Sequence, residues 1–169
     1  MASILKVNTI QDATNSNTAM TIDSTGRILT PARPSFRAQP SSEITNQTSG
    51  DIIFGEAGAN DEATHGCHNV GGHYSTSTGK FTAPVTGIYF FSFSAMTYGE
   101  NDCEVELLLN TQRVVKFNAN VTNDESNYES IGGSIVIKMS ASDFLHPKVA
   151  GGNFHGNTDH SQFSGFLVG

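Results

Sequence analysis

The stretch GKFTAPVTGIYFFSF, residues 79–93, contains two alternating sets of side chains, and both sets become apolar toward its end. The first set is apolar or aromatic throughout: Phe81, Ala83, Val85, Gly87, Tyr89, Phe91 and Phe93. The second set starts with Lys80 and Thr82 but turns apolar at Ile88 and Phe90. A strand of an antiparallel sheet usually has one buried face and one solvated face. A strand in this stretch therefore needs a cover for its second face as well.

The composition is typical of a β protein with many turns. Of the 169 residues, 37% are hydrophobic, only 15% are charged and 17 are glycine, and Ser, Thr and Asn are abundant. The length suits one compact domain with a small appendage. The net charge of −7 argues against nucleic acid and anionic membranes as partners, because both are bound by basic patches.

The N-terminal sequence MASILKVNTIQDATNSN has no apolar run of signal-peptide length, and no stretch of the chain is apolar over the length of a membrane span. We therefore expect synthesis in a cytoplasm, no export by the ordinary route and no membrane insertion. The two cysteines, Cys67 and Cys103, do not make a disulfide framework, so reduced thiols are expected in this compartment. A disulfide between them is the alternative.

Residues 1–31 differ from the rest of the chain and are predicted to form a stem or attachment segment. Their short alternating pieces contain few apolar residues and are separated by the turn sequences QDATNSN and DSTG. Such pieces are too short to bury themselves in a monomer, so they need either the main domain or copies of themselves as a partner. Pro31 and Pro34 then predict a stiff linker into the main domain, residues 32–169.

The main domain is predicted to consist of short strands separated by turns, as in a sandwich or barrel. Strands are expected at residues 35–38, 51–54, 69–74, 80–83, 87–96, 103–110, 113–120, 128–139, 144–149 and 162–168. The sequence AGGNFHGNTDH, residues 150–160, is expected to be a glycine-rich loop. Pro84 is expected to separate two consecutive strands, because proline cannot donate to a ladder.

The predicted strands fall into two classes. Residues 103–110 and 113–120 each have one apolar face and one largely polar face, whereas GIYFFSF, SIVIKM and SGFLVG are apolar on both faces. A Phe or Ile side chain left in water forgoes about 1.5–3 kcal/mol. We therefore expect two sheets: one with a solvated outer face, and one whose outer face packs against another copy of the chain.

The spacing Tyr74, Phe81, Gly87, Tyr89, Phe91, Phe93 resembles the signature of the globular head domain of complement component 1q, which shares the jelly roll of tumour necrosis factor. Asn69 matches the family's Asn or Asp five positions before the first aromatic residue, and Ala63 departs from the family's Phe. The stretches GGSIVIKM and FSGFLVG follow in the family's order. The resemblance covers roughly residues 32–169.

This resemblance implies a ten-strand, two-sheet jelly-roll sandwich, all-β, that assembles as a homotrimer with one sheet around the three-fold axis. It implies binding and not catalysis, and no catalytic motif of the common hydrolase or phosphate-binding kinds is present. The residues expected in the trimer interface or the family signature are Tyr74, Phe81, Gly87, Ile88, Tyr89, Phe90, Phe91, Phe93, Phe166 and Val168. Of these, Ile88 and Phe90 are predicted to face a neighbouring subunit.

The N-terminal segment is similar to the leading segments of bacteriophage tail-fibre proteins. This similarity implies a trimeric tail-fibre protein in the virion that contacts other tail proteins through its N-terminus. It would be assembled in the host cytoplasm and become extracellular after release. Its head loops would bind a host surface receptor or glycan. The alternatives are a bacterial or animal recognition module of the complement 1q type, or a structural virion spacer.

Three polar regions are candidates for ligand contact, since binding residues concentrate on loops of rigid scaffolds. The ligand-loop candidates are Tyr98, Asp102, Asn123, Asp124, Glu125, Tyr128, Asn153, His155, Asn157 and Asp159. A metal site, with calcium as the possible cofactor, is a weaker hypothesis, because the regular spacings of zinc and calcium motifs are absent. Its candidate ligands are Asp102, Asp124, His65 and His68.

Overall fold

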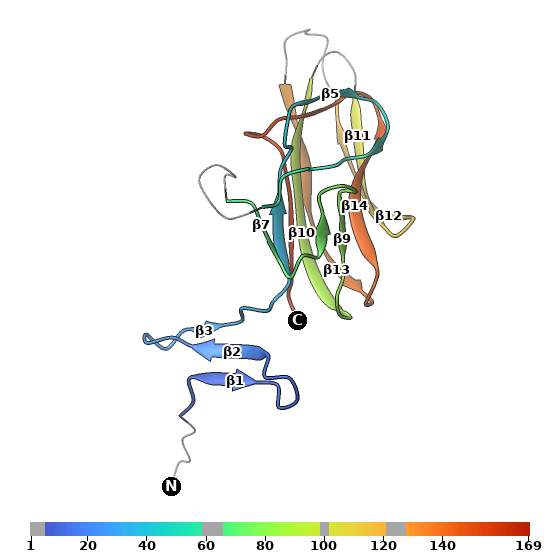
Figure 1. Ribbon diagram of the computed structural model, residues 1–169. Coiled ribbons are helices and arrows are strands. Elements are labelled where there is room, and N and C mark those ends of the chain that lie inside the picture. Colours follow the sequence, from blue (N-terminus) through green and yellow to red (C-terminus); the bar gives the residue numbers. More distant parts are fainter. Residues whose placement is uncertain (1–5, 59–65, 99–101, 121–127) are drawn as a thin grey trace. The chain divides into compact units, whose positions relative to one another are not determined.

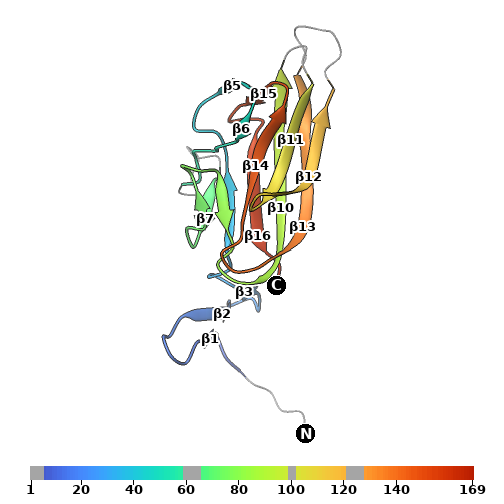
Figure 2. The ribbon, with the colours of Figure 1, turned by 90° about the vertical axis from the view of Figure 1, so that its right-hand side faces the viewer.

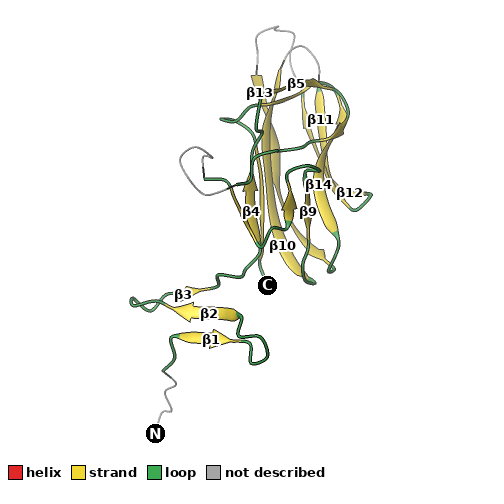
Figure 3. Cartoon of the chain, viewed as in Figure 1, coloured by secondary structure: helices red, strands yellow, loops and turns green. Residues whose placement is uncertain are grey.

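The computed structural model describes residues 6–58, 66–98, 102–120 and 128–169. Within these residues all regular structure is β, and Figure 3 shows strands joined by loops and turns. None of the described residues belongs to a helix that could cross a membrane. The chain divides into two compact units, Met1–Arg33 and Pro34–Gly169, called here the N-terminal unit and the sandwich unit.

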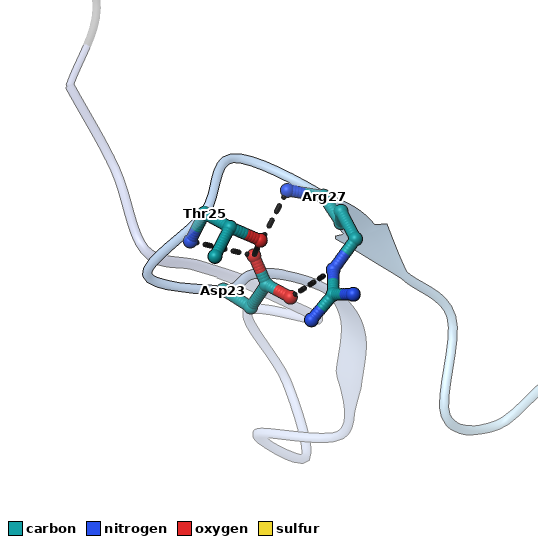
Figure 4. Close-up of polar contacts among 3 residues, drawn as sticks. All are labelled: Asp23, Thr25 and Arg27. Atoms are coloured by element: carbon teal, nitrogen blue, oxygen red, sulfur yellow. Dashed lines mark hydrogen bonds and ion pairs between the residues drawn. The ribbon is translucent and has the colours of Figure 1, made fainter.

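The N-terminal unit is a three-stranded antiparallel sheet with the strand order β1–β2–β3. Its strands are β1 (Thr9–Gln11), β2 (Thr18–Ile22) and β3 (Ile28–Leu29). The turn between β2 and β3 is built on Asp23, as Figure 4 shows. Its Oδ1 accepts hydrogen bonds from the Thr25 amide at 2.9 Å and the Arg27 amide at 3.0 Å, and its Oδ2 lies 2.6 Å from Arg27 Nε. These bonds, above all that from the Arg27 amide, lower the pKa of Asp23 to about 2.

The sandwich unit has two sheets, which Figures 1 and 2 show as facing layers. The first, called the β10 sheet, has the order β5–β15–β10–β16–β4–β7, and β13 pairs with the other edge of β10. Its strands are β4 (Ser35–Ala38), β5 (Ile44–Gln47), β7 (His68–Val70), β10 (Gly87–Tyr98), β13 (Tyr128–Met139), β15 (Phe154–Gly156) and β16 (Gln162–Leu167).

The second, called the β11 sheet, has the order β12–β11–β14–β9–β8, and β6 pairs with β14. Its strands are β6 (Gly50–Asp51), β8 (Tyr74–Ser75), β9 (Lys80–Thr82), β11 (Cys103–Leu109), β12 (Gln112–Ala119) and β14 (Phe144–Gly151). The three strands predicted to be apolar on both faces, β10, β13 and β16, are direct neighbours in the β10 sheet, but the outward register is apolar only at their end near Phe90. The predicted division into two sheets is therefore confirmed, and packing of one outer face against another copy stays a prediction.

Aromatic side chains fill the space between the sheets. Phe36 of β4 stacks on Tyr74 with ring centroids 4.7 Å apart and on Phe81 at 5.1 Å, and Phe81 meets the edge of Phe91 at 5.4 Å. Each ring of this size stabilises the fold by about 1.5–3 kcal/mol when it is fully buried. Opposite Phe91 in the ladder lies Gly165, and the Phe91 ring occupies the space that a Cβ at this position would take. The glycine thus lets the strand backbone and the ring approach closely.

Several predicted strands differ from the observed ones. In residues 51–54 only Asp51 is in a strand, because the alternation of Ile52, Ile53 and Phe54 reflects burial and not ladder pairing. Residues 69–74 divide into β7 and β8, because Gly71 and Gly72 both have positive φ angles and turn the chain between them.

The predicted glycine-rich loop at 150–160 is wrong in its first half. Strand β14 runs on to Gly151, and β15 follows because the buried Phe154 pairs with Thr97 of β10. Strand β5, which pairs with β15, was also not predicted. Since β5 belongs to one sheet and β6 to the other, residues 44–51 cross between the sheets. The Gln47 side chain supports this crossing by donating to the Asp51 carbonyl at 3.0 Å.

Candidate functional site

The outer face of the β10 sheet carries a contiguous group of apolar side chains. Phe90 pairs in register with Val136 of β13 on one side and with Phe166 of β16 on the other, and the Phe90 and Phe166 ring centroids lie 5.3 Å apart. One row further along, the Val168 amide donates to the Ile88 carbonyl at 2.7 Å. We call Ile88, Phe90, Val136, Phe166 and Val168 the apolar patch.

The apolar patch is exposed to solvent in a single chain. Four of its side chains are exposed, from 37% at Ile88 to 64% at Val136, and Phe90 between them is half-buried. Neighbouring aliphatic and aromatic side chains on three adjacent strands form one connected surface. Such exposed apolar surfaces, when they are contiguous, mark sites of protein association.

The opposite faces of the same strands are buried in the core. Of the predicted interface and signature residues, five are buried between the sheets: Tyr74, Phe81, Tyr89, Phe91 and Phe93. Gly87 begins β10, and a Cβ there would come within 2.7 Å of the Leu167 side chain. The remaining four, Ile88, Phe90, Phe166 and Val168, lie in the apolar patch. The signature aromatics therefore hold the monomer together, and only the other register of β10 is available for association.

The far end of the same outer face is polar and contains a pocket of about 360 Å³. Ser94 and Met96 of β10, Ser130 of β13 and Gln162 of β16 supply part of its wall, and these strand positions share the outward register of Phe90. Arg37 of β4 lies in the same wall and donates from Nε to Gln162 Oε1 at 2.9 Å.

The loop after β15 closes this pocket with Thr158, Asp159, His160 and Ser161. The Asn157 carboxamide fixes the loop, because its Oδ1 accepts a hydrogen bond from the Asp159 amide at 3.0 Å. Hydroxyl, amide, carboxylate and guanidinium groups thus converge on one cavity, which can hold a polar ligand group about the size of a sugar ring. Among the described residues, Asp159 is the predicted ligand-loop residue that lies in its wall.

Of the other predicted ligand-loop residues that the structure describes, Asn157 borders this pocket through its bonds to Asp159 and Ser161, and Asp102, Tyr128, Asn153 and His155 are not in its wall. His155 is buried, with Nε2 3.2 Å from Glu43 Oε1, and its ring lies edge-on to the exposed Tyr128 at 5.7 Å. This corrects the expectation of a solvent-facing loop histidine, because residues 154–156 form β15. Asp102 is exposed and Asn153 is half-buried. Asn123, Asp124 and Glu125 lie outside the described residues, as does the side chain of Tyr98.

Of the four predicted metal ligands, the structure describes only His68 and Asp102, and they do not form part of a metal-binding group. His65 and Asp124 fall outside the described residues, and His68 is half-buried with Nδ1 3.4 Å from the Gly66 carbonyl oxygen. Among the residues that the structure describes, no three His, Cys, Asp or Glu side chains are grouped to hold a metal ion. A calcium site stays a prediction.

Sequence reasoning missed a buried histidine on the outer side of β14. His146 lies with Nε2 3.2 Å from Asp51 Oδ1, and Lys80 approaches the same carboxylate at 3.8 Å. The Nδ1 atom of His146 is buried and has no hydrogen-bond partner among the residues that the structure describes. Burial lowers the pKa of His146, and the nearby Asp51 carboxylate only partly offsets this effect. No local sequence signal pairs these residues, since they meet only through the β6–β14 ladder.

Both cysteines are free and buried, as the expected reduced state requires. Burial, together with the adjacent Glu104 charge, raises the pKa of Cys103 to about 11. Burial also raises the pKa of Cys67, although the Arg37 guanidinium, with Nη1 3.9 Å from its sulfur, opposes the shift. Neither thiol is therefore activated as a nucleophile.

The sandwich unit matches known sequences over nearly its whole length. The profile described as "C1q domain" matches residues 36–168. Mouse "Complement C1q tumor necrosis factor-related protein 3" is 32% identical over 137 residues, which are 79% of this chain. The chain spans about half the length of that relative, since the match covers 50% of it.

Solved structures show the same fold at low sequence identity. The globular domain of zebrafish complement 1qA protein aligns with a TM-score of 0.60 at 22% identity, covering 80% of this chain and 98% of that one. The Eiger TNF of S. frugiperda aligns with a TM-score of 0.57 at 8% identity, covering 82% and 94%. Murine APRIL aligns with a TM-score of 0.58 at 9% identity, covering 80% and 99%. The sandwich unit is thus an all-β jelly roll of this type.

Proposed function

Because the chain belongs to the C1q domain family, we propose that it is a non-enzymatic recognition module that assembles as a homotrimer through the apolar patch. The observation that carries this proposal is the second apolar face of β10, β13 and β16. A monomer leaves Val136 64% exposed on this face. Packing three copies around one axis lets the neighbouring subunits cover the patch of every subunit.

We assign recognition to the polar end of the outer face of the β10 sheet and to the loop after β15 beside it. The pocket beside Asp159 and Gln162 lies on the same outer face as the apolar patch, so an assembly through the patch holds three such pockets near one another. Weak contacts of one pocket with a receptor or surface glycan then multiply, because the second and third contacts become intramolecular.

Two settings for this module are distinguished by different observations. The similarity of the sandwich unit to a mouse complement C1q-related protein supports an extracellular recognition module. A virion protein that binds a host cell, expected from the sequence of residues 1–31, is the second setting; the comparisons do not support it, and it stays a prediction. The assembly and binding chemistry proposed here are the same in both settings.

The assembly is tested by sedimentation equilibrium of the full chain at micromolar concentration. Three chains are expected, and a folded single chain at all concentrations would refute the proposal. Binding is tested on glycan arrays and on candidate cells with wild type and Asp159→Ala. The variant is expected to lose at least about tenfold in apparent affinity, whereas Asp12→Ala, at an exposed acid of the N-terminal unit, is the matched control. Equal binding by both variants would remove the pocket from the proposal.

A further inference from the structure

The N-terminal sheet has one apolar face that is only partly covered, with Met20 and Ile22 half-buried and Ile10 and Ile28 exposed. The register pairs Ile10 with Met20 and Ile22 with Ile28, and Met20 and Ile22 share a face because they are two positions apart in β2. All four apolar side chains therefore lie on one side of the sheet, called here the stem face. Ile28 is 63% exposed and Ile10 is 45% exposed.

The opposite face of the sheet is more polar. It carries Thr9 and Thr21, which pair with each other, together with Leu29, which pairs with Thr21. The sheet is also small, with strands of three, five and two residues. A sheet with such short strands buries little apolar surface by itself, so it gains stability when its apolar face is covered. The stem face is therefore the surface that must gain a partner.

The chain enters the sandwich unit beside the apolar patch. Ser35, the first residue of β4, pairs in register with Phe166, and the Leu167 amide donates to the Pro34 carbonyl at 3.0 Å. Only residues 30–34 separate β3 from β4, a span of at most about 18 Å when fully extended. An assembly through the apolar patch therefore brings the N-terminal sheets of its subunits to within a short distance of one another.

We propose that the stem face packs against the stem faces of the other copies in the same assembly, so that residues 6–33 form a self-associated β stem. The inference rests on the proposed function, because the sandwich units supply the tether. Tethering by so short a segment gives an effective concentration on the order of millimolar, at which a small apolar face is sufficient for association. The occupant of the stem face is thus a second and third copy of this chain.

The proposal is tested by cross-linking the full-length protein. Ile28→Cys places a thiol on the stem face, and Leu29→Cys places one on the opposite face at a residue that is 49% exposed. The native thiols are buried, so wild type supplies a blank. With a short bifunctional maleimide, Ile28→Cys is expected to give at least about ten times more covalently linked chains than Leu29→Cys on a denaturing gel.

A second measurement does not depend on thiol chemistry. Trypsin can cleave after Arg27 in the β2–β3 turn, and packing of the stem face slows the opening that cleavage requires. Ile10→Asp is expected to speed this cleavage at least about tenfold, and Thr9→Asp, on the other face of the same strand, less than about twofold. Equal rates for the two variants would overturn the proposal.

The remaining outcomes separate this inference from the proposed function. Three sedimenting chains without preferential cross-linking at residue 28 overturn the stem and leave the sandwich trimer standing. Protection of Ile28→Cys from a monofunctional maleimide without interchain cross-linking assigns the stem face to the chain's own sandwich unit, and also overturns it. A single sedimenting chain overturns the proposed function as well.

Discussion

Replacing Val136 by aspartate separates assembly from folding. Val136 lies in β13, at one end of the row that continues through Phe90 to Phe166, and it is 64% exposed in one chain. In the monomer the substitution therefore costs about 1 kcal/mol or less of unfolding free energy. In the trimer the same position is covered, and an unpaired carboxylate there must lose its water.

The effect on the trimer is large enough to measure. Full burial of a valine contributes about 1.5 kcal/mol, so the exposed fraction corresponds to about 1 kcal/mol per chain and about 3 kcal/mol per trimer. Each buried, unpaired carboxylate adds at least about 2 kcal/mol, which brings the total to about 9 kcal/mol and lowers the association constant about 10⁶-fold.

The assay is sedimentation velocity at micromolar concentration, together with a circular dichroism melt. Val136→Asp is expected to sediment as one folded chain. Val85→Asp is the matched control, because Val85 is also an exposed valine, at 47%, but lies in the bend before β10 and outside the patch. A Val136→Asp variant that still sediments as three chains would refute the reasoning, as would a variant that fails to fold.

Four further predictions concern the fold. Burial lowers the pKa of His146 below its ordinary value of 6.5, so its contribution to folding stability should be complete above pH 6.5 and fall as the pH drops below it. In thermal melts, His146→Gln should lose less stability between pH 7 and pH 5 than wild type does. His160→Gln, at an exposed histidine, is the control and should behave as wild type. Because the pKa of Asp23 is lowered from 3.8 to about 2, the stabilisation of its turn is present above pH 3.8 and lost as the pH falls through about 2. Nuclear magnetic resonance should show the Thr25 and Arg27 amides titrating with the lower midpoint, and a midpoint near 3.8 would contradict the hydrogen bonds of Figure 4. Cys67 and Cys103 should not react with Ellman's reagent in the native protein at pH 8 but should react fully in denaturant; rapid native reaction would show that they are accessible. Gly165→Val should destabilise the fold by about 1–3 kcal/mol in urea unfolding, because the Phe91 ring occupies the space of its side chain, and an unchanged midpoint would be inconsistent with this packing.

The two-sheet architecture could be predicted from local alternation. In a strand every second side chain shares a face, so burial on one or both faces is written into a few consecutive residues. The apolar registers of residues 87–93, 134–139 and 164–169 predicted one sheet with two apolar faces, and these segments lie in β10, β13 and β16. The spacing from Tyr74 to Phe93 added the fold type, because it fixes where aromatic side chains enter one core.

The sites depended on contacts that the sequence does not encode locally. Arg37 meets Gln162, which lies 125 residues away in the chain, and His155 reaches Glu43 from β15. The His146–Asp51 pair arises from a ladder between a two-residue strand and β14. Such pairings follow from the order of strands in the sheets, and the Ser, Thr, Asn and Gly residues around them have no periodicity to analyse.

In the stretch GKFTAPVTGIYFFSF, the alternation of side chains was enough to predict that both faces of its second strand are apolar at Ile88 and Phe90, and that Pro84 lies between two strands. Which set belongs to the core became clear from the packing of the two sheets: Tyr89, Phe91 and Phe93 pack against the β11 sheet, and Ile88 and Phe90 are left outside. The alternation of a strand is symmetric between its faces, so it cannot say on which side the second sheet lies. The packing partner breaks that symmetry, and it is supplied by residues far away in the chain.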